Sequence, residues 1–173
     1  MTNSTPGSAG KAASTGGVQL REITEADLPI LFEHQRDPHA NHMAAFTARE
    51  PSDRDVFMAH WAKILADDTI IKRTIIYEGQ VAGNIVCFGW QGKREVGYWL
   101  GREHWGKGIA TAALGEFLGV VTERPLYAAA AKDNAASIRV LEKCGFVITG
   151  HDRGFSNARG EEIEEVMLEL NNY

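Results

Sequence analysis

The sequence has only two cysteines, Cys87 and Cys144, and neither lies in a CxxC or Cys/His arrangement. This spacing argues against a zinc finger and a disulfide framework, so both thiols are expected in the core of a protein from a reducing compartment. Cationic residues are also scarce, because 18 Lys and Arg stand against 23 Asp and Glu, for a formal net charge of -5. A nucleic-acid partner is therefore not expected, since phosphate binding requires clustered Lys and Arg.

Long apolar runs are missing as well. No segment approaches the roughly 18 consecutive apolar residues that a membrane-spanning helix requires. The N-terminus also lacks the basic-then-apolar order of a secretory signal. We therefore expect a soluble, cytoplasmic protein with no membrane partner.

Length and composition are those of one domain. The 173 residues, 44% of them hydrophobic, suffice for a single sizeable core. Residues 1–17 are mainly Ser, Thr, Gly and Ala, which bury too little apolar surface to offset the entropy lost on ordering. The sequence thus predicts a flexible tail over residues 1–17 and one folded domain over residues 18–173.

Along the domain the spacing of apolar residues alternates between the period of a strand and that of a helix, and no internal repeat is visible. Helices are expected over residues 24–36, 51–65, 109–121 and 134–144, with a His- and Ala-rich loop between the first two. Strands are expected over residues 18–23, 70–77, 81–90, 95–100, 126–131, 146–150 and 163–170. Glu78-Gly79 should form a tight hairpin turn.

The glycine-bearing segment Gly101-Arg-Glu-His-Trp-Gly-Lys-Gly108 lies between an expected strand and an expected helix. Backbone N–H groups at a helix start lack intrahelical partners, and the helix dipole adds partial positive charge there. Glycines allow a phosphate to approach these donors closely. Taken alone, the segment is either a phosphate-binding loop or a tight strand-to-helix turn.

Two common phosphate-binding patterns fail in this segment. Gly101 to Lys107 satisfies the first seven positions of the Walker A pattern, but Gly108 stands where a magnesium-binding Ser or Thr is required. The dinucleotide fingerprint fails because Thr111 takes the position of its third glycine. A nucleotide phosphohydrolase would therefore lack its metal ligand, and magnesium-dependent nucleotide binding would test that hypothesis.

A second segment begins 26 residues after Gly108, and it reads Asn134-Ala-Ala-Ser-Ile-Arg-Val-Leu-Glu-Lys-Cys-Gly-Phe146. Together the two segments resemble the GNAT superfamily of acetyltransferases. With Glu95-Val-Gly-Tyr-Trp-Leu-Gly101 they are similar to the branch that contains the ribosomal-protein N-terminal acetyltransferases. The resemblance runs from Val18 to Leu170. It implies an α/β (α+β) fold, with a mixed, mostly antiparallel sheet of about seven strands, a parallel central pair splayed around the cofactor, and about four flanking helices.

The resemblance also implies a site for acetyl-CoA. In the family, a loop of Gln or Arg, two residues, Gly, one residue, and Gly or Ala binds the CoA pyrophosphate through backbone amides. Here Gly108 and Ala110 take the small positions and Trp105 the first position. The preceding strand would pair its edge with the pantetheine amides. The implied cofactor-binding residues are Trp99, Leu100, Gly101, Trp105, Gly106, Lys107, Gly108, Ile109, Ala110, Thr111 and Asn134.

Asn134 and Ser137 have two interpretations. The resemblance implies that the Asn134 side chain binds the pantetheine and that the Ser137 hydroxyl lies near the thiol, but Asn before a helix is also a preferred N-cap. Many family members carry a Tyr on this helix as general acid, and Leu141 stands at the corresponding position. Either the acid is absent, or Ser137 or a water replaces it.

Transfer from a thioester to an amine requires a proton acceptor and stabilisation of the departing thiolate. Glu95 matches the carboxylate that family members place at the start of the central strand, although beside Arg94 it is equally a solvated charge at a strand end. A backbone N–H of residues 99–101 would stabilise the oxyanion.

The region from Asp37 to Arg54 is where family members build the acceptor pocket, so its residues His39, His42, Met43 and Phe46 are expected to shape substrate choice. The histidine spacings fit no HExxH-type site, and no metal is expected. The resemblance implies N-acetyl transfer from acetyl-CoA to a primary amine, either a small molecule or a peptide N-terminus, by a monomer or homodimer. The acidic composition favours cationic acceptors. The alternative is a non-catalytic acyl-CoA-binding module, which the missing helix tyrosine supports.

Overall fold

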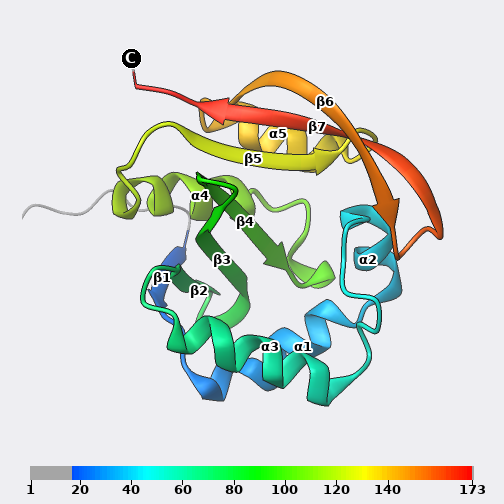
Figure 1. Ribbon diagram of the computed structural model, residues 1–173. Helices are drawn as coiled ribbons and strands as arrows, with labels where there is room; N and C mark the ends of the chain where they lie inside the picture. Colours follow the sequence, from blue (N-terminus) through cyan, green and yellow to red (C-terminus); the bar gives the residue numbers. More distant parts are fainter. Residues whose placement is uncertain (1–16, 173) are drawn as a thin grey trace, which may run out of the picture.

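The computed structural model describes residues 17–172, which form a seven-stranded sheet flanked by helices (Figure 1). The strands are Val18–Glu22 (β1), Ile71–Tyr77 (β2), Gln80–Trp90 (β3), Lys93–Leu100 (β4), Leu126–Ala131 (β5), Val147–Ser156 (β6) and Glu161–Leu170 (β7). Their spatial order is β1-β2-β3-β4-β5-β7-β6. Neighbouring strands are antiparallel apart from the parallel pair β4 and β5.

Two tight turns connect β2, β3 and β4. Glu78 and Gly79 have φ values of 49° and 77°, and Gln91 and Gly92 have 48° and 76°. Two consecutive residues with positive φ are typical of the type I′ turn, whose twist matches that of an antiparallel hairpin. The hairpin turn expected at Glu78-Gly79 is confirmed.

Strands β4 and β5 separate soon after they begin. Their parallel register joins Arg94 to Leu126 and Glu95 to Tyr127. Beyond that point β5 continues along β7, whereas β4 continues along β3 as far as Leu100. Figure 1 shows the two strands diverging. The expected parallel central pair that splays apart is confirmed.

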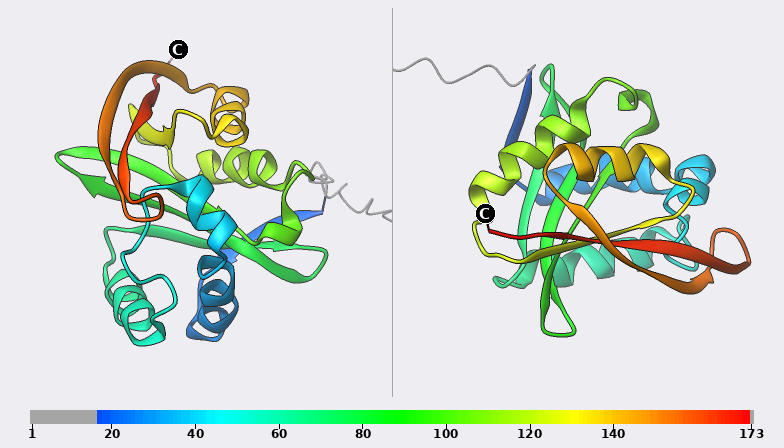
Figure 2. Two further views of the ribbon diagram at one scale, coloured as in Figure 1. Left: turned by 90° about the vertical axis from the view of Figure 1, so that its right-hand side faces the viewer. Right: turned by 90° about the horizontal axis from the view of Figure 1, so that it is seen from above.

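Helices cover both faces of the sheet (Figure 2). On one face α4 (Ile109–Val120) and α5 (Ala135–Lys143) contribute Phe117 and Leu141 to the main core, which also contains Ile75 and Ile85 of the sheet. On the other face α1 (Leu28–Gln35) and α3 (Arg54–Ala66) form a second core. Its buried residues are Ile23, Leu28, Leu31, Phe32, Phe57 and Trp61.

Residues 38–44 form a helix where the sequence predicts a loop. This helix, α2 (Pro38–Ala44), begins at Asp37, whose carboxylate accepts hydrogen bonds from the backbone N–H groups of His39 (2.9 Å) and Ala40 (3.2 Å). Pro38 takes the first helical position, where a missing N–H costs nothing. The Asp-Pro pair therefore ends α1 and also starts α2, so the loop prediction was wrong there. The described residues contain five α-helices.

Strand β6 extends to Ser156, well past Gly150 where the sequence predicts its end. The register with β7 shifts between Ile148 and Gly150, and a bulge of this kind lets a strand continue past a glycine. One 3-10 turn, Glu25–Asp27 (η1), precedes α1, and another, Arg102–His104 (η2), lies within the glycine-bearing segment. The tail expected over residues 1–17 lies outside the described residues, except for Gly17. Among the helices described, none has the length and apolar character to cross a membrane.

Candidate functional site

The end of β4 presents one edge to the space that opens between β4 and β5. Within the described residues, the register between these two strands stops at Glu95, so the later part of this edge is unpaired by β5. The Gly101 N–H is already bonded to the Ala82 carbonyl at 2.9 Å. N–H directions alternate along an antiparallel strand, so the Trp99 N–H also faces β3. Of the amides expected to stabilise an oxyanion, that of Leu100 is therefore left as the candidate.

Gly106 and Gly108 give the loop after β4 its shape. Their φ values are 72° and 74°, in the left-handed region that favours glycine. No atom lies within 4 Å of a Cβ built on either glycine, so the space in front of the loop is open. Gly108 is the N-cap of α4, and the N–H groups of the first helical turn, at Ile109, Ala110 and Thr111, face this end of the helix. An anion could therefore bind to them.

Trp105 fastens this loop to the end of β4. Its indole N–H donates to the Leu100 carbonyl at 3.1 Å, and its ring lies 5.7 Å from that of His39 on α2, measured between centroids. The Lys107 ammonium lies 5.9 Å from the ring centroid of Tyr77. Trp105, at the first position of the loop pattern, thus acts on the loop through its indole and leaves anion contacts to the backbone.

Asn134 caps α5 and also holds α2. Its side-chain oxygen accepts from the Ser137 N–H at 3.3 Å, and its side-chain nitrogen donates to the Met43 carbonyl at 3.2 Å. The capping interpretation is therefore confirmed. A contact between Asn134 and pantetheine stays a prediction.

The Ser137 hydroxyl meets the phenol of Tyr98 on β4, with 3.0 Å between the two oxygens. Burial raises the pKa of Tyr98, and the hydrogen bond with Ser137 offsets part of that increase. Leu141, which occupies the helix position of the expected acid, is only 2% exposed and belongs to the main core. The sequence reasoning missed Tyr98, although strand alternation puts it on the same face as Val96 and Leu100.

Glu95 points to the opposite face of β4 from Tyr98, because side chains alternate along a strand. Burial raises the pKa of the half-buried Glu95 carboxyl, and Lys93 offsets part of this effect. On β7, burial raises the pKa of Glu165, and the charges of Asp152 and Glu95 raise it further. Two carboxyl groups on different strands therefore hold protons more readily than surface carboxylates do.

Helix α2 and the residues after it are tied to the β6–β7 hairpin by long-range hydrogen bonds. Arg159 donates to the His42 carbonyl at 3.0 Å and makes a bidentate pair with Asp133 at 2.6 and 2.9 Å. The buried Ser156 hydroxyl donates to the Ala45 carbonyl at 2.6 Å. These bonds fix the backbone beside His42 and Met43, but the His42 side chain is exposed.

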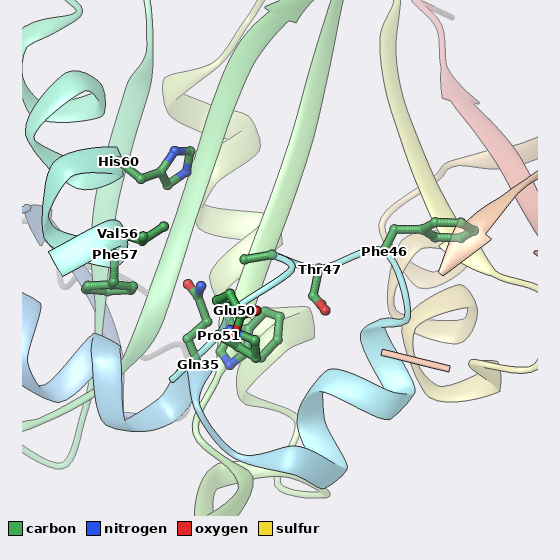
Figure 3. A pocket seen from close by; sticks show the side chains of 10 residues that line it. Gln35, Phe46, Thr47, Glu50, Pro51, Val56, Phe57 and His60 are labelled. Carbon is green, nitrogen blue, oxygen red and sulfur yellow. The ribbon is translucent and has the colours of Figure 1, made fainter. Parts of the chain in front are cut away.

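A cavity of about 440 Å³ lies between α1, α3 and the segment after α2 (Figure 3). Its lining residues are Gln35, Phe46, Thr47, Ala48, Glu50, Pro51, Val56, Phe57, His60 and Trp99. Of the four residues expected to shape acceptor choice, Phe46 belongs to this lining, whereas His39, His42 and Met43 do not. Phe46 points toward the β6–β7 hairpin in Figure 3. A Cβ built on Gly154 of this hairpin would lie 3.1 Å from the Phe46 ring. His60 was assigned no role from the sequence, because its helical spacing carries no signal of a cavity.

The imidazoles of His34 and His104 meet the carboxylate of Glu103 beside Gly101. Possible ligand atoms of these three residues lie within 4.8 Å of one another, an approach that the sequence spacing did not indicate. However, both Nδ1 atoms are buried without a hydrogen-bond partner among the described residues, whereas a metal-bound histidine usually donates its other ring N–H. Burial also lowers the pKa of His34. We assign this cluster to packing, since a Cβ at Gly101 would lie 2.7 Å from the His34 ring.

Comparison with known protein families matches residues 18–147 to the acetyltransferase (GNAT) domain. YdaF of Bacillus subtilis (strain 168), named as a ribosomal N-acetyltransferase, is 31% identical over 119 residues, which cover 62% of this chain and 65% of YdaF. The uncharacterized N-acetyltransferase p20 of Bacillus licheniformis is 36% identical over 83 residues, or 46% of this chain and 47% of p20. The matches thus span less than two thirds of the length of these curated relatives.

Solved structures share the fold over nearly the whole chain. Spermidine N-acetyltransferase from Vibrio cholerae, in complex with CoA and spermine, superposes with a TM-score of 0.77 at 17% identity, covering 90% of this chain and 95% of that one. Ribosomal-protein-alanine N-acetyltransferase from Brucella melitensis gives a TM-score of 0.75 at 23% identity, covering 89% and 99%. At these identities the likeness establishes the fold.

Proposed function

Because the chain belongs to the GNAT acetyltransferase family, we propose that it transfers the acetyl group of acetyl-CoA to a primary amine. One observation carries the proposal, namely that the splayed β4–β5 pair lies between an open helix start and half-buried carboxyl groups. The helix start suits the CoA pyrophosphate, and the carboxyl groups suit an amine. The thioester would lie between them.

The cofactor half of the site would act through its backbone. The first turn of α4 and the open space at Gly106 and Gly108 would accept the pyrophosphate, with Lys107 adding positive charge nearby. The unpaired edge of β4 would bond the pantetheine amides by strand addition. The Leu100 N–H, which faces away from β3, would stabilise the oxyanion as the amine attacks.

Glu95 would accept the proton of the attacking amine. An ammonium group has no lone pair for attack, so its proton must leave before or during transfer. Burial raises the pKa of Glu95 toward the range of a useful base, and Glu165 adds a second carboxyl group near it. The amine nitrogen forms the new bond to carbon, the carbon–sulfur bond breaks, and the sulfur keeps the electron pair.

The acceptor would be a cationic amine. Glu95, Glu165 and Asp152 interact electrostatically on the acceptor side, and buried carboxyl groups favour a nearby positive charge. A neighbour in fold is a spermidine acetyltransferase solved with spermine, and a sequence relative is named for ribosomal substrates. Polyamines and peptide N-termini are thus the two acceptor classes to compare.

The test is CoA release, followed with a thiol reagent, from acetyl-CoA mixed with spermidine or with Ala- and Ser-initiated peptides. The wild-type protein should release CoA and acetylate one class, as seen by mass spectrometry. Glu95→Gln should lower kcat by about a hundredfold, as expected for loss of a general base.

Glu116→Gln is the matched control, because Glu116 is exposed on α4 and also loses one negative charge. Its kcat should equal that of the wild type. Binding of acetyl-CoA without turnover on any amine would instead support a non-catalytic acyl-CoA-binding module.

A further inference from the structure

The hydrogen bond between Tyr98 and Ser137 joins the two elements that border the opening beside β4. Tyr98 lies on β4, and Ser137 lies in the first turn of α5. Their oxygens are 3.0 Å apart, and both side chains are partly or largely buried. The Ser137 backbone N–H is held separately by the Asn134 side chain. The position of the Ser137 hydroxyl is therefore fixed from two sides.

Either hydroxyl can donate in this hydrogen bond, and the surroundings of the phenol favour Tyr98 as the donor. Burial keeps Tyr98 protonated across the neutral range, so its O–H is available as a donor. Cys144, the other group that interacts electrostatically with Tyr98, donates its S–H to the Thr111 carbonyl at 3.6 Å. Ser137 is therefore the acceptor that the structure offers to the phenol, and its own O–H is then free to donate elsewhere.

We propose that Tyr98 is a positioning residue that donates to Ser137 and thereby aims the Ser137 hydroxyl at the sulfur of the departing CoA. A chain of two hydrogen bonds strengthens the terminal donor, because each bond polarises the next. Both hydroxyls keep their protons. When the carbon–sulfur bond breaks, the sulfur takes the electron pair and the Ser137 O–H stabilises the resulting thiolate. The Tyr98–Ser137 pair thus supplies the polar group that is missing at the buried Leu141, the helix position of the expected acid.

This inference rests on the proposed function, but it can be tested without an amine. CoA alone is bound to the protein, and the absorbance of its thiolate is titrated against pH for the wild type, Tyr98→Phe, Ser137→Ala and the double variant. A donor at the sulfur lowers the pKa of the bound thiol, so each substitution should raise it. The double variant should match Ser137→Ala, because Tyr98 acts through Ser137.

Turnover supplies the second measurement. Tyr98→Phe keeps the ring and its packing, so thermal unfolding and the KM for acetyl-CoA should stay close to the wild type. The kcat should fall about tenfold, as for one lost hydrogen bond between neutral groups. Ser137→Thr retains a hydroxyl and should recover most of the kcat that Ser137→Ala loses. The effects of Tyr98→Phe and Ser137→Ala should not add.

A bound-thiol pKa that Tyr98→Phe leaves unchanged would overturn the inference, as would fully additive losses of kcat. If CoA binds and its thiol responds to both variants while no amine is acetylated, the inference stands and the proposed transfer to an amine fails. If CoA does not bind to the wild type, both fail.

Discussion

The cofactor side and the acceptor side of this site are built in different ways. Most of the cofactor side is one continuous stretch, residues 99–111, whose features are a strand end, two glycines with positive φ and a helix start. The acceptor side combines the segment around α2 with the β6–β7 hairpin, through side-chain bonds between residues more than 100 positions apart, such as Ser156 with Ala45. A short motif can encode the first arrangement, but only the folded chain creates the second.

Helix α2 lies where the two sides meet. At its start, Asp37 forms an ion pair with Arg102 at 3.0 Å, and His39 lies against Trp105 of the cofactor loop. At its end, Met43 is bonded through its carbonyl to Asn134. Whether a change on one side of the site also affects the other therefore depends on how α2 responds.

The largest expected effect is on the stability of the whole fold and not on either side of the site. It comes from Asp27, a buried group outside the site. The Asp27 carboxylate pairs with Arg21 and also accepts hydrogen bonds from Thr74 and the Thr24 N–H, at 2.7 Å and 3.0 Å. Arg21, above all, lowers the Asp27 pKa from 3.8 to about 2. A depressed pKa contributes stability that is complete above pH 4 and is lost as pH falls toward 2, and this shift corresponds to roughly 2 kcal/mol.

Asp27→Asn should therefore lower the free energy of unfolding at pH 7 by at least about 2 kcal/mol and flatten its decline between pH 4 and pH 2. Urea unfolding at several pH values measures both effects. Asp68→Asn, at an exposed turn, is the control and should match the wild type. An unchanged pH dependence in Asp27→Asn would contradict the assignment.

A smaller effect should separate the two sides. Arg159→Gln removes the bonds from the hairpin to the His42 carbonyl and to Asp133. We expect the KM for the amine to rise about tenfold, as for loss of a bidentate charged pair, with the Kd for acetyl-CoA changing less than about twofold. Steady-state kinetics and calorimetry measure these two quantities.

Arg153→Gln is the matched control, because Arg153 lies on the same hairpin and pairs only with the exposed Glu164 among the described residues. It should leave both quantities unchanged. Equal weakening of acetyl-CoA and amine binding in Arg159→Gln would mean that the two sides are not separate.

Much of the fold could be predicted from the sequence, because its signals are local. The hairpin at Glu78-Gly79, the helix that Asn134 caps and the glycine loop each depend on neighbouring residues. Helix α2 was missed because Asp37-Pro38 both ends one helix and starts another. The turn after α2 could not be predicted from the sequence either. There Ala45 adopts a φ of 65° and the Phe46 N–H bonds to the Ala44 carbonyl, a strained turn that no glycine marks.

The candidate site divides in the same way. The glycine loop lies where the motif predicts it, and the Asn134 cap is present. Tyr98 was missed because its meeting with Ser137 joins positions 39 residues apart. The raised pKa of Glu95 depends on burial. Its burial could not be predicted, because a Glu beside Arg94 is typical of an exposed strand end.

Calorimetric titration of acetyl-CoA into wild-type protein, Gly108→Asp and Gly92→Asp measures whether the glycine loop holds the cofactor. Both glycines have nearly the same φ, 74° and 76°, and both have open space at the Cβ position, but they lie beyond opposite ends of β4. Asp tolerates such a backbone, and at position 108 its carboxylate would repel a pyrophosphate. Acetyl-CoA should bind to the wild type and to Gly92→Asp, and binding should be lost in Gly108→Asp. Equal binding to all three proteins would mean that this loop does not hold the cofactor.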